Sequence, residues 1–146
     1  MVDSSTLVMQ TLQNNWSLSS PGQTDVYWVS AKVEMMDWAK LGKNIVVACY
    51  SGSGPVQAVP LSAEVWQKTE QVTVDIIVKV GTGTAEDANT IRDSMATEVY
   101  RIIHSSQFTI SGISAVYVSR ESFKVESAEL SRLALQVSCV SFNISS

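Results

Sequence analysis

Residues 71–104 read QVTVDIIVKV GTGTAEDANT IRDSMATEVY RIIH, an alternating apolar segment followed at once by a helical one. Apolar side chains occupy every second position from Val72 to Val80, which predicts a strand with one buried face. From Ala88 to Ile102 the apolar residues recur at intervals of three and four, as they do on one face of an α-helix. Thr84 is the expected cap of this helix. The stretch therefore predicts a strand joined to a helix that packs on a sheet.

The remaining segments extend this pattern in both directions. A short helix is expected at 3–15, and further strands at 26–35, 45–50, 56–62, 64–80, 113–119 and 130–142. Because the strands cluster instead of alternating with helices, the fold class is α+β. We expect a mostly antiparallel sheet of at least four strands, with the helix at about 84–104 packed on one face through Ile91, Met95 and Val99. Residues 1–146 are expected to form one domain.

Two segments between the strands are predicted to be loops, 36–44 and 120–128. In the last strand, Val140 and Phe142 fall on the face opposite the earlier apolar residues. This switch predicts a bulge, or a strand end that is covered on both sides.

The composition indicates assembly. Only 16% of the 146 residues are charged, against a usual ~25%, and the chain has 22 serines. Hydroxyl groups cost less to bury than charges, so such a surface suits a protein interface, although an ordinary soluble domain with few charges is also consistent with it. The net charge of −4 and the lack of a basic cluster argue against tight binding of nucleic acid. No secretion signal or membrane-spanning segment is recognisable, so we expect assembly in the cytosol.

No catalytic, metal or cofactor site is expected. His104 is the only histidine and ends a predicted helix, where a cation favours the dipole. Cys49 and Cys139 are expected to be buried free thiols, paired only if their strands lie close together. The carboxylates Asp75, Glu121, Glu126 and Glu129 form no recognisable pair and are expected to face solvent or a lumen.

Apolar side chains in exposed positions indicate an interface. Trp28 lies on the polar side of its predicted strand, and aromatic and aliphatic residues occur in both predicted loops. Exposed tryptophans often anchor interfaces, although they also cover the rim of a core. The interface candidates are Trp28, Trp38, Leu41, Phe123 and Val125.

Most of the chain from Ile45 onwards resembles the tail-terminator, or tail-completion, proteins of long-tailed bacterial and archaeal viruses. The likeness rests on the strands KNIVVA (43–48) and VTVDIIV (72–78), the amphipathic helix Ala85 to His104 and the closing strand RLALQV (132–137). Tube, head-closure and baseplate proteins of such viruses share comparable patterns.

The resemblance implies a structural protein of the virion, located at the neck and assembled in the host cytoplasm. It implies a ring of six copies that caps the tail tube, ends tube polymerisation and joins the head connector, or stopper. The tail tube protein and the connector are then the partners, genome DNA passes through without specific binding, and no membrane, cofactor or metal is involved. The acidic candidates Glu121, Glu126 and Glu129 would face the lumen. Alternatives are another tail or neck protein (tube or head closure), or a non-viral α+β module that binds a small molecule or peptide.

Overall fold

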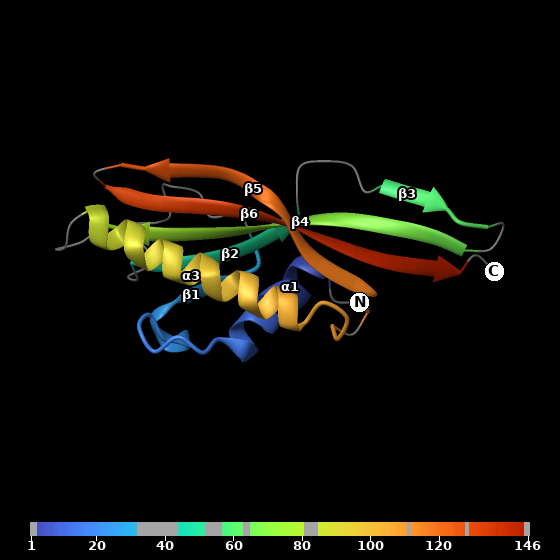
Figure 1. Ribbon diagram of the computed structural model, residues 1–146, viewed down its shortest axis with the longest axis horizontal. Helices are drawn as coiled ribbons and strands as arrows, with labels where there is room; N and C mark the ends of the chain where they lie inside the picture. Colours follow the sequence, from blue (N-terminus) through green and yellow to red (C-terminus); the bar gives the residue numbers. More distant parts are fainter. Residues whose placement is uncertain are drawn as a thin grey trace.

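A computed structural model of the chain describes residues 3–31, 44–51, 57–62, 65–80, 85–110, 112–127 and 129–144. Within these ranges the sheet has six strands and two α-helices accompany it (Figure 1). The elements, in chain order, are α1 (Ser4–Asn15), the 3₁₀ turn η1 (Gln23–Asp25), β1 (Tyr27–Val29), β2 (Ile45–Ser51), β3 (Gln57–Pro60), β4 (Val65–Lys79), α3 (Ala85–Ser105), β5 (Ala115–Glu126) and β6 (Leu130–Ile144). The predicted α+β class is confirmed.

The sheet is built around one long antiparallel pair. β4 and β6 pair along their whole length, from Val65 opposite Ile144 to Lys79 opposite Leu130. The strand order is β1-β2-β4-β6-β5, and every neighbouring pair is antiparallel except β1 with β2. β3 and β2 share one edge of β4, with β3 beside 66–69 and β2 beside 72–78.

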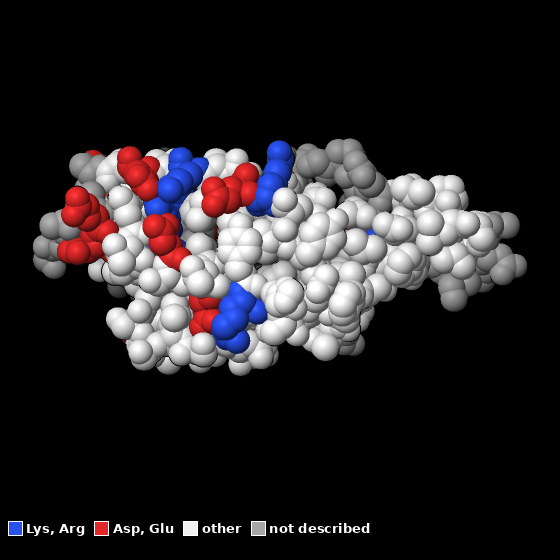
Figure 2. All heavy atoms as spheres, viewed as in Figure 1, with Lys and Arg blue, Asp and Glu red and all other residues white. Residues whose placement is uncertain are grey.

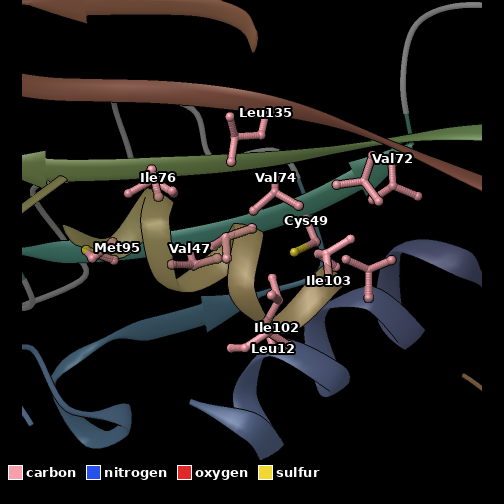
Figure 3. Close-up of a cluster of buried hydrophobic side chains, with 14 of the residues drawn as sticks. Leu12, Val47, Cys49, Val72, Val74, Ile76, Met95, Ile102, Ile103 and Leu135 are labelled. Atoms are coloured by element: carbon pink, nitrogen blue, oxygen red, sulfur yellow. The ribbon is translucent and has the colours of Figure 1, made fainter. Parts of the chain in front are cut away.

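Both helices cover the same face of this sheet, as predicted for the long helix (Figure 1). The alternating residues of β4 and β6 meet the apolar side of α3, so the periodicities that predicted strand and helix also determine what packs together. Figure 3 shows Met95, Ile102 and Ile103 of α3 and Leu12 of α1 directed at the sheet. The sheet residues that meet them include Val47, Cys49, Val72, Val74, Ile76 and Leu135.

Polar contacts fix both helices at their ends. Asp3 caps α1 by accepting a hydrogen bond from the backbone N–H of Thr6 at 2.9 Å, which lowers the pKa of its carboxyl. The buried Glu98 of α3 accepts hydrogen bonds from the backbone N–H (2.9 Å) and the hydroxyl (2.6 Å) of Ser17, and pairs with Arg101. Arg101 in turn donates to the backbone carbonyl of Asn15, so α3 holds the end of α1.

A buried arginine holds α3 to strands β5 and β6. Arg92 is almost fully buried and donates to the hydroxyl of Ser131 on β6 at 2.7 Å. Its guanidinium also pairs with Asp93 and with Glu126 on β5, both at 2.8 Å. These two carboxylates compensate the buried charge.

Three sequence-based expectations are wrong in detail. Residues 120–128 were predicted to be a loop, but β5 continues to Glu126 because its backbone pairs with β6, and this pairing does not require apolar side chains. The bulge expected near Val140 is absent from β6, which pairs with β4 without a register shift; the irregularities lie in β5, between Val118 and Arg120 and between Glu121 and Phe123. The strand expected at 26–35 ends at Val29 within the described residues.

The sheet extends beyond its helices at one end. There, β3, the first five residues of β4 (65–69) and the last four of β6 (141–144) project past α1 and α3 (Figure 1). We call these strand segments, with the turn residues 61–62, the β-arm. Its strands are continuous with the body of the sheet, which makes the β-arm a stiff extension and not a loop.

Candidate interaction surface

The face of the sheet opposite the helices has a small apolar cluster of its own. Val46, Ala48 and Ile77 are fully buried there, and the partly exposed Tyr27 and Tyr50 pack against them. No described helical residue belongs to this cluster. This face therefore differs from the helix-covered face in having no helical layer among the described residues.

An ion pair lies beside this cluster. Asp75 of β4 is fully buried and accepts hydrogen bonds from Nε of Arg132 on β6, at 2.9 and 3.2 Å, and from its Nη2. The hydroxyl of Tyr50 lies 3.3 Å from the same carboxylate, and burial together with the charge of Asp75 raises the pKa of Tyr50 to about 12. The ring of Phe123 covers the guanidinium at 4.9 Å.

The expectation that Asp75 faces solvent or a lumen is therefore wrong. Arg132 stands 57 positions away in the sequence, so only the pairing of β4 with β6 shows that the two are partners. A carboxylate in an otherwise apolar strand was the available signal, because a buried charge needs a partner.

The other acidic candidates are exposed. Glu121 lies on β5 and Glu129 just before β6. Glu126 also lies on β5, but it pairs with Arg92 and with Lys124, at 2.8 and 3.3 Å, and these partners lower its pKa. The prediction that the three glutamates face a lumen stays a prediction.

The interface candidates occupy different places. Trp28 packs against the main core, meets Trp16 edge-on at 5.2 Å and donates to the backbone carbonyl of Gln23, so it does not lie on a polar face as predicted. Phe123 and Val125 lie on β5, both about 40% exposed. Trp38 and Leu41 lie outside the described residues. The interface role predicted for all five candidates stays a prediction.

The β-arm presents apolar side chains that sequence reasoning did not select as an interface. Val59, Leu61, Trp66 and Phe142 are each 40–54% exposed. Lys68 is the only charged residue among the β-arm positions, and Figure 2 shows few charges at this end of the molecule. The sequence contains a signal for this surface, because the strand ends that form the β-arm carry almost no charge, whereas strand ends at a solvated edge are usually charged.

A second apolar feature lies between α3 and β5. A hollow of about 190 Å³ is lined by Ile103, His104 and Gln107 near the end of α3 and by Val116 and Val118 on β5, and it is bordered by two tyrosines. These tyrosines, Tyr100 and Tyr117, are each more than 40% exposed. The hollow is smaller than the ~300–1,000 Å³ of small-molecule sites and closer to the size of one side chain. We call it the α3–β5 hollow.

Metal-ligand clusters and thiols were the remaining features to locate among the described residues. They contain no group of three or more His, Cys, Asp or Glu side chains placed to hold a metal ion. Cys49 and Cys139 are buried free thiols, as predicted, and burial raises the pKa of both, that of Cys139 to about 12. β4 lies between the strands that carry them. No described helix is both long and apolar enough to span a bilayer.

Comparison with solved structures finds the same fold in a virion. A chain of the structure described as "Virion of native gene transfer agent (GTA) particle" matches with a TM-score of 0.61 and 15% sequence identity. The match covers 94% of this chain and 92% of that chain, so the two share the whole architecture. No protein-family model matches the sequence. No curated protein matches it either.

Proposed function

We propose that this chain is a structural protein of a phage-like virion and not an enzyme. In this proposal it forms a ring at the junction of head and tail, where it caps the tail tube, ends tube polymerisation and contacts the head connector. The observation that carries the proposal is the fold shared over nearly the full length with a chain of a gene transfer agent virion.

Two features of the molecule support assembly. The β-arm exposes four large apolar side chains on a projection that carries one charge. Exposed apolar surface of this kind on a small protein usually meets a partner. The net charge of −4 also suits a ring through which DNA passes without adhering, because a negative surface repels the phosphates.

The test combines mass measurement with electron microscopy. Purified protein is examined by light scattering and negative stain, alone and with the tail tube protein of the same virus. We expect closed rings of about six subunits that do not grow into tubes, and that bind the ends of preformed tubes.

Each alternative predicts a different result. A tube protein would polymerise into long tubes on its own, and a head-closure protein would bind the connector but leave tube ends free. A chain that stays monomeric at all concentrations and ignores tube ends would contradict the proposal.

A further inference from the structure

The β-arm has the properties of a segment that is covered in the assembled state. Its outer edges are β3 on one side and residues 141–144 of β6 on the other, since the pairing of β5 with β6 stops at Val140. Unpaired strand edges attract other chains, and proteins usually protect them with charges. Here the two edge segments, 57–60 and 141–144, carry no charged residue, and Pro60 in β3 is the protecting feature among them.

The β-arm cannot cover its own apolar side chains. β4 and β6 pair without interruption from the body of the sheet to the tip, so the projection cannot bend back towards α3. Leu61 and Trp66 lie at the tip, at the end of β4 that points away from the helices (Figure 1). These side chains are therefore free to contact a partner chain.

We propose that the β-arm of one copy packs against the α3–β5 hollow of the next copy, with Trp66 filling the hollow between Tyr100 and Tyr117. This inference rests on the proposed ring and identifies the surfaces that form it. The two surfaces match in character because both are nearly free of charge. Lys68 is the one charged residue of the β-arm, and the titratable residues that line the hollow are His104, Tyr100 and Tyr117. Aromatic side chains held in such pockets are typical interface anchors.

The arrangement is compatible with a ring, because head-to-tail contacts close into a ring when the rotation between neighbours completes a circle. The β-arm and the hollow are different surfaces of one chain, so the contact is head-to-tail, and each copy offers one free β-arm and one free hollow. The exposed apolar side chains lie on both faces of the β-arm, because Val59 and Phe142 are both paired with Gln67, whereas Trp66 stands one position earlier and faces the other way. The unpaired edges of β3 and of residues 141–144 add backbone hydrogen-bonding groups to the same projection.

The test uses two variants of the full chain that each destroy one surface. The arm variant is Trp66→Glu and the hollow variant is Tyr100→Glu. Both positions are at least 40% exposed, so each variant should fold with an unchanged circular dichroism melting curve. The matched control is Phe108→Glu, because Phe108 is 71% exposed and belongs to neither surface.

In light scattering we expect rings for the wild type and the control, and monomers for each surface variant. Mixing the arm variant with the hollow variant leaves one intact contact per pair, so the mixture should give a 1:1 dimer and nothing larger. Native mass spectrometry measures that dimer directly.

The failures are distinguishable. Rings formed by the wild type and by both surface variants would overturn this inference but leave the proposed ring intact. Monomers in the arm variant without a dimer in the mixture would mean that the β-arm binds another surface, and the hollow assignment would be wrong. A wild type that never assembles would overturn both the inference and the proposed function.

Discussion

The ion pair between Asp75 and Arg132 gives a quantitative test of the fold. In Asp75→Ala the guanidinium of Arg132 would keep its position under Phe123 but lose its carboxylate. The Arg132 side chain is only 15% exposed, so solvent cannot replace the lost partner. Removing one member of a buried pair costs about 3–5 kcal/mol, because it leaves an uncompensated charge.

The expected effect is large for a protein of this size. Domains of this length have a free energy of unfolding of about 5–15 kcal/mol, so the substitution removes a substantial part of the stability. A loss of about 3 kcal/mol corresponds to a fall of roughly 10 °C in Tm at about 2–4 °C per kcal/mol. The free energy of unfolding falls by about 2 kcal/mol per molar of urea, so the urea concentration at the unfolding midpoint should fall by roughly 1.5 M.

A double-mutant cycle with Arg132→Met separates the pair from its surroundings. Removing both charges leaves no unpaired ion, so the double variant should lose at least about 2 kcal/mol less than the sum of the single variants. Urea unfolding followed by circular dichroism measures all four proteins. A cost below about 1 kcal/mol for Asp75→Ala, with additive effects in the cycle, would refute the buried pair.

Four further predictions follow from the other buried and terminal groups. Met95→Asp places a charge in the core and should abolish cooperative unfolding in a thermal melt, whereas a normal Tm would show that Met95 is not packed there. Cys49 and Cys139 should resist a thiol reagent at pH 8 in the native protein and react in urea; rapid native labelling would contradict their burial. Burial alone would raise the pKa of Glu98, but hydrogen bonds from Arg101 and Ser17 outweigh burial and lower this pKa. The contribution of Glu98 to stability is therefore present above the usual glutamate pKa of 4.5 and is lost as the pH falls through the lowered pKa. Glu98→Gln should therefore flatten the stability profile below about pH 5, and an unchanged profile would argue against this contact. His104→Gln should leave Tm and assembly nearly unchanged, and loss of a bound metal on elemental analysis would contradict that expectation.

The sequence by itself determined the helices and the buried faces of the strands. Apolar spacing of two in β4 and of three and four in α3 placed Val74 and Met95 in one core, because side-chain periodicity depends only on local backbone geometry. The cap at Asp3 is equally local, since its hydrogen bond spans three residues. The free, buried state of the cysteines followed from their apolar neighbours.

Only the tertiary structure decided which strands are neighbours and what they bring together. The polar sequence of β5 resembles a loop, yet its backbone completes the sheet because hydrogen bonding to β6 does not depend on side-chain polarity. Asp75 and Arg132 became partners through the register of β4 with β6, and that register follows from the summed burial of two long strands. The β-arm likewise exists because β4 and β6 are longer than the helices that cover them, a relation between distant segments that no local pattern contains.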